Sequence, residues 1–405
     1  MAIPNRQIFT TLALLFVFAG ASQPAARAGT GALEYYSHSL RVDGIERQVT
    51  VPEGYRLELL SSDFRGPRLL SFGPANELLI GSKSGLIYRL APPYTEVEVL
   101  ARVGGYPHSL LVRADELLVA RTDGVYAIGY APEKPLDTSR VRTVARLPAG
   151  SGHNTRSLAL GPDGRVFVSL GISGICSEQY LGAEYEFDNR RGGVMVLNET
   201  VSPPVWEAFA SGLRNPVGFD WHPSTGVMYA SNNGPDHLGY DVPPEYFSKL
   251  TSGSYHGMPW FQYDGERMRR DPCASREPPL PMEQVSLPVV TFPARNAPMG
   301  VGFVPIGAMD SSLEGDALVA LRGSWGTAPS GSTSGDPATR REPKIVVVRF
   351  ASGTATRVDD LVTGFQVANG KRWARPVGIK VGPDGSVYFT SDEGINALFR
   401  LVRLK

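Results

Sequence analysis

Residues 157–169 read SLALGPDGRVFVS, in which two short apolar runs flank the tetrapeptide Gly-Pro-Asp-Gly. Glycine, proline and aspartate favour tight turns, and short apolar runs bounded by such turns are typical of β-strands. The stretch therefore predicts a β-hairpin. A closely similar hairpin, GIKVGPDGSVYFT, is predicted for residues 378–390, so the pattern recurs in a distant part of the chain.

The unit of two apolar strands around a turn occurs six times along the sequence. The units are residues 69–81, 109–120, 157–169, 218–230, 300–320 and 378–390, with an interruption between residues 305 and 316 of the fifth. One hairpin cannot bury both of its faces, so repeated units of this kind stack around a common axis. The sequence predicts an all-β fold, a six-bladed β-propeller with long inter-strand loops. A β domain followed by a helical domain is disfavoured, because no long window has helical periodicity.

The length of the chain implies that several blades carry insertions. About 63 residues are available per blade, against roughly 40–50 in compact propeller repeats. The longest spacings fall at residues 236–282 and 323–343, which are rich in proline, glycine and serine. We expect these insertions to form the rim of a central pocket, and a strand within residues 48–60 to close the ring by pairing with the last blade.

The charge of the protein argues against one class of partner. The 405 residues include 40 Lys+Arg and 40 Asp+Glu, which gives a formal net charge of zero. A nucleic-acid-binding protein needs a surplus of basic residues to displace the counterions of the phosphate backbone. We therefore expect no nucleic acid as a partner.

The N-terminus has the pattern of a secretory signal. Residues 8–19 form an apolar run that follows Arg6 and precedes Ala26-Arg27-Ala28. This order is typical of a cleaved signal peptide, and the run is too short to span a bilayer comfortably. We expect residues 1–28 to be a signal peptide and residues 29–405 the propeller, exported to the periplasm or outside the cell without stable membrane insertion. In such an oxidising compartment the two cysteines, Cys176 and Cys273, are able to pair.

Polar segments next to the predicted inner strands are the candidates for function, since their side chains would face the axis. Three of them are GHNTR at residues 152–156, GLRNPVG at 212–218 and NNGPD at 232–236. A further group from the last two blades comprises Arg322, Trp325, Arg372 and Arg375.

These motifs occur in the order found in the soluble quinoprotein sugar dehydrogenases. From about residue 67 to residue 404 the chain resembles this family, and most closely its sorbosone dehydrogenase-like branch. Members of the family are six-bladed propellers that use pyrroloquinoline quinone (PQQ) with calcium. The resemblance implies an oxidoreductase that oxidises a sugar or a sugar aldehyde, of the aldose or sorbosone type, by hydride transfer to PQQ, with an external electron acceptor.

The resemblance also implies roles for individual residues. His153 is expected to be the general base, a task that suits an imidazole that titrates near neutral pH. Arg214 and Asn215 complete the expected catalytic set, with Asn215 near the quinone oxygens and Arg214 also among the arginines that hold the PQQ carboxylates. Because arginine pairs well with carboxylates, the three carboxylates of PQQ would be held by several arginines. The full expected set for PQQ is Arg214, Asn215, Asn233, Arg322, Trp325, Arg372 and Arg375.

The calcium ligands implied by the resemblance are the backbone carbonyl groups of Gly234 and Pro235, with Asn233, Asp236 and Asp241 as weaker candidates. Carbonyl oxygens are ligands that this hard cation accepts.

Trp325 would form a flat wall for a ring, although a core position is an equally good interpretation. Two other functions stay open, a calcium-dependent propeller lactonase or other hydrolase and a binding module without catalysis. The sequence does not specify the sugar, the electron acceptor or the oligomeric state.

Overall fold

The computed structural model describes Met1 and residues 32–177, 191–308 and 312–404. The signal peptide predicted for residues 1–28 lies, apart from Met1, outside the described residues. Within the described ranges, no helix is long and apolar enough to cross a membrane. Short 3-10 turns are present at η1 (Thr138–Arg140), η3 (Met282–Gln284) and η4 (Pro337–Thr339).

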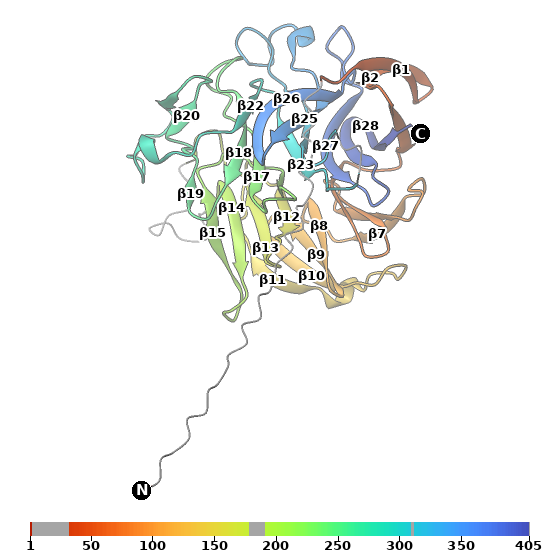
Figure 1. Cartoon of the computed structure of the whole chain (residues 1–405), viewed down its shortest axis with the longest axis horizontal. Coiled ribbons are helices and arrows are strands. Elements are labelled where there is room, and N and C mark those ends of the chain that lie inside the picture. Colours follow the sequence, from red (N-terminus) through yellow and green to blue (C-terminus); the bar gives the residue numbers. More distant parts are fainter. Residues whose placement is uncertain (2–31, 178–190, 309–311, 405) are drawn as a thin grey trace.

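Six β-sheets are arranged around a central axis, with their innermost strands near the middle of the ring (Figure 1). The first blade contains β4 (Pro67–Phe72), β5 (Leu78–Ser82), β6 (Leu86–Leu90) and β7 (Glu98–Arg102). The second contains β8 (Ser109–Arg113), β9 (Glu116–Arg121), β10 (Gly124–Gly129) and β11 (Arg142–Arg146). The third contains β12 (Arg156–Leu160), β13 (Val166–Leu170), β14 (Gly193–Asn198) and β15 (Val205–Ser211), and the short β19 (Ser254–Tyr255) pairs with β15 in parallel.

The other three blades follow the same plan. The fourth contains β16 (Phe219–Trp221), β17 (Met228–Asn232), β18 (Glu245–Leu250) and β22 (Val290–Phe292). The fifth contains β23 (Pro298–Phe303), β24 (Ala317–Leu321), β25 (Lys344–Ala351) and β26 (Thr354–Val362). The sixth contains β27 (Ala374–Val381), β28 (Val387–Arg403) and β3 (Tyr55–Ser61). The predicted six-bladed β-propeller is confirmed, and each of the six sequence units forms the first two strands of one blade.

The ring closes through a strand from the N-terminal region. The first part of β28 pairs with β27, and its last part pairs with β3, where Leu401 lies opposite Leu57. The closure expected from residues 48–60 is therefore confirmed, with β3 as the closing strand. β3 thus forms the outermost strand of the last blade and joins the two ends of the described chain in one sheet.

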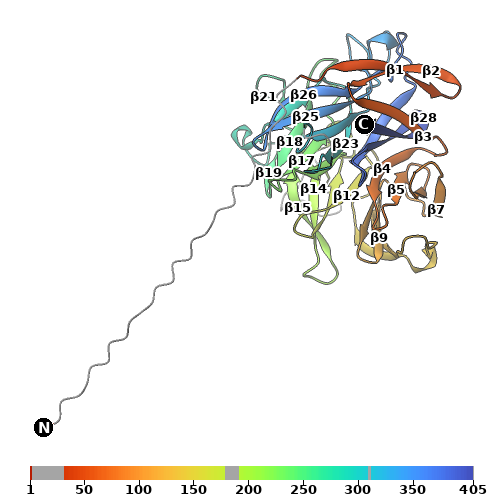
Figure 2. The same ribbon diagram turned by 45° about the vertical axis from the view of Figure 1, so that its right-hand side comes forward.

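Two hairpins lie outside the six blades. The hairpin of β1 (Tyr35–Val42) and β2 (Ile45–Pro52) lies beside the fifth and sixth blades, and Thr50 bridges to Thr363 (Figure 2). The second hairpin, β20 (Phe261–Tyr263) and β21 (Met268–Arg270), belongs to the predicted insertion at residues 236–282. That prediction was too broad, because β18 within it is a regular strand of the fourth blade.

The alternation of strand residues explains why the blades must stack. Successive side chains of a strand point to opposite faces. Leu78 and Ile80 of β5 pack against the sixth blade, whereas Leu79 between them packs against the second. The same division gives a separate apolar cluster at every blade-to-blade contact, so each blade buries both faces only in the complete ring.

A disulfide joins Cys176 to Cys273, with their Cα atoms 5.6 Å apart and 97 positions between them in sequence. It connects the loop after β13 to the insertion that follows β21. In the chain-entropy model, a cross-link that closes a loop of this size stabilises the fold by roughly 4.7 kcal/mol.

Candidate active site

A cavity of about 380 Å³ opens at one end of the axis, where the innermost strands begin. The start of a first strand and the end of a second strand meet at the same end of a hairpin, so each blade can contribute side chains there. The cavity is lined by Arg68, Lys83, Tyr106, His153, Thr155, Arg214, Asn215, Val217, Asn233, Gly234, Asp236, Glu245, Arg295, Ala297, Met299, Arg322, Gly323, Ser324, Trp325 and Arg375. All six blades are represented among these residues.

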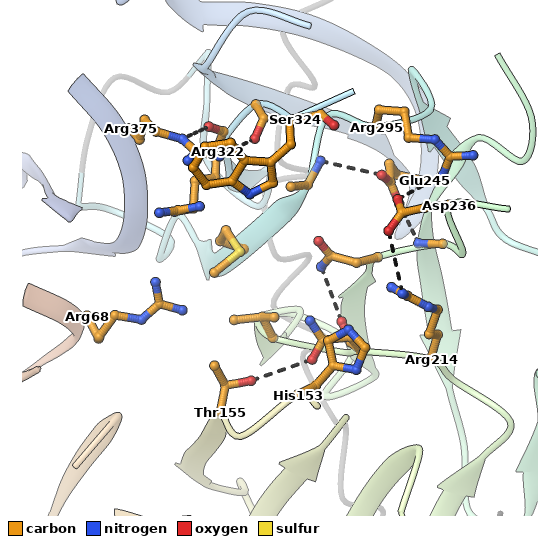
Figure 3. A pocket seen from close by; sticks show the side chains of 18 of the residues that line it. Arg68, His153, Thr155, Arg214, Asp236, Glu245, Arg295, Arg322, Ser324 and Arg375 are labelled. Atoms are coloured by element: carbon orange, nitrogen blue, oxygen red, sulfur yellow. Dashed lines mark hydrogen bonds and ion pairs between the residues drawn. The ribbon is translucent and has the colours of Figure 1, made fainter. Parts of the chain in front are cut away.

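His153 lies in the loop before β12 and points toward this cavity (Figure 3). Its Nδ1 is 2.7 Å from the carbonyl oxygen of Ile172. A carbonyl oxygen only accepts, so Nδ1 carries the proton and Nε2 has a free lone pair. Burial and the positive charge of Arg214 lower the pKa of His153 to about 4, although the Ile172 contact opposes the shift. The imidazole is therefore neutral at pH 7, as a base must be.

Two buried arginines fix the backbone of this loop. Nη2 of Arg191 and Nη1 of Arg156 both donate to the carbonyl oxygen of His153, at 2.8 and 3.0 Å. Arg191 Nε also donates to Gly171. These contacts fix the backbone position of His153.

Arg214 and Asn215 precede β16 and lie next to His153. The Arg214 side chain is buried, its Nη2 is 3.7 Å from the Asp236 carboxylate, and its Nε has no hydrogen-bond partner among the described residues. Asn215 is held by its backbone N–H, which donates to Asn232 at 3.0 Å. Its side-chain oxygen accepts a long bond of 3.5 Å from Thr155.

The opposite wall is a cluster of cations around one carboxylate. Asp392 accepts from Arg68, Lys83 and Arg322 at 2.6, 2.7 and 2.8 Å. Burial alone would raise the pKa of Asp392, but Arg68 and the other two cations outweigh it and hold the pKa well below its usual range. Three positive charges therefore surround one negative charge.

Arg375 adds a fourth cation to this wall. It donates to the carboxylate of Glu393 at 2.8 Å and to the carbonyl oxygens of Arg322 and Gly323. Burial, with the charges of Arg322 and Arg372, lowers the pKa of Arg375 to about 9, so it stays charged at neutral pH. With Asp392 and Glu393 counted, the wall keeps an excess of positive charge, which suits an anionic ligand.

Trp325 is 54% exposed and forms a flat side of the cavity. The guanidinium groups of Arg375 and Arg372 lie 4.9 and 5.2 Å from its ring centroid. The alternative of a core tryptophan is therefore wrong. Arg372 does not line the cavity; it stacks on Trp325 and donates to the carbonyl oxygen of Ser324.

The segment that follows β17 forms the remaining corner. Gly234 lines the cavity, and its N–H donates to Glu245 at 2.5 Å. Glu245 is buried, and burial raises its pKa to about 7 against the opposing effects of Gly234, Arg295 and Arg214. The carbonyl oxygen of Pro235 accepts from Nη1 of Arg295.

Most residues expected at the site are brought together around this one cavity. They are His153, Arg214, Asn215, Asn233, Gly234, Arg322, Trp325 and Arg375. Arg372 and Pro235 lie just behind its surface, and Asp241 pairs with Arg341 at 2.7 Å outside it. The expected rim is also present in part, since Asp236 and residues 323–325 come from the two predicted insertions.

Arg68, Lys83 and Arg295 line the cavity, although none of them was predicted from the sequence. The repeat register itself carried a signal for the first two. Arg68 directly precedes the first unit, as Arg156 precedes the third, and Lys83 follows β5 as Asn233 follows β17. Aligning the polar residues on both sides of each unit would have placed Arg68 and Lys83 at the axis.

The role of Arg214 in the low pKa of His153 is testable on the protein without any ligand. Arg214→Met removes a positive charge but keeps a side chain of similar length. The protonated imidazole of His153 is then repelled less strongly. We expect the pKa of His153 to rise from about 4 toward its ordinary value, as measured by NMR titration of the histidine ring signals. An unchanged pKa would show that burial alone is responsible.

Comparison with known proteins agrees with this architecture. The family model described as glucose/sorbosone dehydrogenase matches residues 137–400. An uncharacterized protein of Borreliella burgdorferi is 24% identical over 382 residues, which cover 90% of this chain and 93% of that protein.

Solved structures show the same fold. The iodide structure of a carbohydrate-active enzyme of family AA12 from Trichoderma reesei has a TM-score of 0.73 at 19% identity, and covers 87% of this chain and 97% of that one. The holo form of the PQQ domain of pyranose dehydrogenase from Coprinopsis cinerea has a TM-score of 0.69 at 18% identity, covering 88% and 97%. Since the family model spans well over half of the residues, the chain belongs to the glucose/sorbosone dehydrogenase family.

Proposed function

We propose that this protein oxidises a sugar or sugar aldehyde, of the aldose or sorbosone type, with PQQ held in the central cavity. The observation that carries the proposal is the pairing of a neutral, oriented His153 with a cavity wall of excess positive charge. Membership of the family and the PQQ-bound state of the structurally similar pyranose dehydrogenase domain support it. Export to the periplasm or outside the cell, with cleavage of residues 1–28, is part of the same proposal.

The residues present fit a flat ligand with three carboxylates. Arg68 and Arg214 each have a buried Nε without a hydrogen-bond partner in the described part of the chain, and both line the cavity. Lys83 has a side chain that is 39% exposed and can turn one of its three donors to a ligand. Trp325 offers a flat face against which a ring system can stack.

The chemistry assigned to the protein's own residues is positioning and proton transfer. PQQ, when bound, supplies the acceptor for the hydride that leaves the substrate carbon. Nε2 of His153 takes the hydroxyl proton of the sugar, or of the hydrate of a sugar aldehyde, as that hydride leaves. The carbonyl oxygen of Ile172 stabilises the imidazolium through Nδ1. Asn215 and Arg214 lie beside His153. Their N–H groups would stabilise negative charge on the oxygen atoms at the reacting centre. The substrate thus loses two hydrogens. One leaves as a hydride that carries two electrons, and the other leaves as the proton on His153. The C–O single bond of the substrate becomes a carbonyl bond.

The residues at the expected calcium site do not fit a calcium ion. Of the two expected carbonyl ligands, that of Pro235 already accepts from the guanidinium of Arg295. The guanidinium of Arg295 is a fixed cation at this position, and it would repel a divalent cation bound beside it. No step of the proposed reaction is therefore assigned to calcium.

The two rival functions make less use of these residues. A calcium-dependent hydrolase needs free acidic ligands at the axis, whereas Asp236 and Asp392 of the described residues pair with arginines. A binding module needs no neutral histidine with a fixed tautomer.

Purified protein mixed with PQQ should reduce an artificial electron acceptor dye in the presence of one or more aldoses or sorbosone. Hydrolysis of lactones without dye reduction across the sugar panel would contradict the proposal.

Gly171 provides a test of how His153 is placed. A Cβ atom at this position would lie 2.4 Å from both Cβ of His153 and Oδ1 of Asn215, so Gly171→Ala must displace these side chains. A displacement of about 1 Å can reduce turnover by roughly 100-fold. We expect such a loss in dye-linked turnover. Gly129→Ala is the matched control, because its Cβ would meet nothing within 4 Å. Equal turnover of the two variants would show that Gly171 does not determine the geometry.

A further inference from the structure

Arg295 is buried at the corner of the cavity that the calcium ion was expected to occupy. It lies between β22 and β23, and its side chain is 1% exposed. Its guanidinium faces the segment after β17, on the same side of the cavity as Asp236 and Glu245 (Figure 3). Arg295 lies outside all the motifs predicted to face the axis.

The guanidinium is enclosed by oxygen atoms of one short segment. Nε donates to the carbonyl oxygen of Gly239 at 2.9 Å, and Nη2 donates to that of Val242 at 2.8 Å and also to Gly239. Nη1 donates to the carbonyl oxygen of Pro235 and, at 3.4 Å, to Oδ1 of Asp236. Arginine has five N–H donors, so all five are used.

This group of acceptors has the composition of a calcium site. Backbone carbonyl oxygens and a carboxylate, supplied by residues close together in sequence, are the ligands that calcium collects. Here a side-chain cation fills the centre of the group. Because Arg214 is also nearby and its carboxylate partner is the same Asp236, a calcium ion would meet two positive charges at close range.

The backbone supports a dedicated role for Arg295. Its φ angle is 68° and that of Ala297 is 51°, both in the left-handed region that residues with a Cβ rarely adopt. Such conformations persist where the surrounding contacts hold them in place. The turn that carries Arg295 is thus kept in an unfavourable conformation while it directs the guanidinium into the oxygen group.

We propose that Arg295 takes the place of a divalent cation in this protein, by ordering residues 234–242 and supplying fixed positive charge, so that PQQ binds without calcium. The inference rests on the proposed function, since it concerns the same cavity. It assigns Arg295 as a positioning residue, because its donors are all used within the protein.

The first test uses the unmodified protein. Isothermal titration calorimetry with PQQ is carried out in EDTA and again in calcium chloride, and calcium chloride is titrated separately into the protein without PQQ. We expect PQQ affinities that agree within twofold and no calcium binding at millimolar concentration. A loss of PQQ affinity of tenfold or more in EDTA would overturn the inference but leave the proposed function intact.

Other outcomes of this test separate the two proposals. If PQQ fails to bind in both buffers, the proposed function fails. The calcium titration then still decides the inference, since calcium binding that disappears in Asp236→Asn would show that the corner is a metal site despite Arg295. Absence of calcium binding would uphold the assignment of Arg295 as the resident cation.

The second test removes the guanidinium of Arg295 from the group of oxygen atoms. Arg295→Ala leaves three carbonyl oxygens without their cation and Asp236 with Arg214 alone, so we expect PQQ affinity in EDTA to fall at least tenfold and calcium to restore it. Arg295→Lys should keep most of the affinity in EDTA, because it retains the charge. Arg341→Ala is the control, since it removes a different arginine contact to the same segment, at Asp241, and should show no response to calcium.

A purely structural role for Arg295 predicts a different result, in which Arg295→Ala loses stability and PQQ affinity but calcium changes neither. That result would contradict the inference. Should Arg295→Ala fail to fold, the comparison of EDTA and calcium on the unmodified protein decides the matter by itself.

Discussion

Replacement of His153 by glutamine is expected to lower kcat/KM for the oxidised sugar by about 100-fold to 10,000-fold, the usual contribution of a general base. Glutamine keeps a polar side chain of similar reach but cannot take a proton from the substrate. PQQ affinity should change little, because the proposed cofactor contacts come from the arginines, Lys83 and Trp325. Dye-linked turnover at saturating PQQ gives the first quantity and calorimetry the second.

The control for this variant is His38→Gln. His38 lies on β1, outside the cavity, where its Nε2 accepts from the backbone N–H of Leu57. It should leave kcat/KM unchanged. If His153→Gln keeps more than a tenth of the normal turnover with PQQ bound, His153 is not the base.

Charge reversal at Lys83 is expected to weaken PQQ binding by about 100-fold or more. A hydrogen bond to a charged group contributes roughly 1.5–3 kcal/mol, and each 1.4 kcal/mol corresponds to about a tenfold change in affinity. Lys83→Glu removes such a donor and also adds a negative charge beside Asp392, to which Lys83 is bonded at 2.7 Å. Lys83→Met, which only removes the charge, should cause a smaller loss of roughly tenfold.

Two features make Lys83 a suitable position for this experiment. Its side chain is 39% exposed, and Asp392 retains Arg68 and Arg322 when Lys83 is lost, so the fold should tolerate the change. Lys134→Glu makes the same charge change at an exposed position away from the cavity. Equal PQQ affinities for Lys83→Glu and Lys134→Glu would mean that the cation cluster does not bind the cofactor.

The blade architecture could be predicted because its signal is local. Five of the six hairpins have two apolar strands around a turn within about a dozen residues, and such short-range patterns are the strongest guide to β-hairpins. β18 could not be predicted because it lacks such a local pattern. Its sequence EYFSKL contains Glu245 and Lys249, and it lies between two irregular segments, so it does not form a hairpin unit with its sequence neighbours.

The candidate site was predictable in so far as its residues adjoin the repeat units. His153, Arg214 and Asn233 lie within a few residues of β12, β16 and β17, and the propeller brings those strand ends to one axis. Arg295 could not be found in this way. Its partners lie more than fifty residues earlier, at Pro235, Gly239 and Val242, and the pairing of β22 with β18 in the fourth blade brings them together.

Arg372 illustrates the limit at the level of single side chains. It is three residues from Arg375, which lines the cavity, and composition alone does not separate the two. Arg375 lies within β27 and faces inward, whereas Arg372 lies in the loop before β27 and stacks on Trp325. The direction of a loop side chain depends on packing, in this case on the aromatic face that Arg372 covers.

The central claim, that PQQ occupies the axial cavity, is tested most directly by a crystal structure of the protein grown with saturating PQQ. We predict density for the quinone between His153, Arg214 and Trp325, with its carboxylates near Arg68 and Lys83. Density for PQQ elsewhere on the protein, or a cavity without it at saturation, would contradict the account.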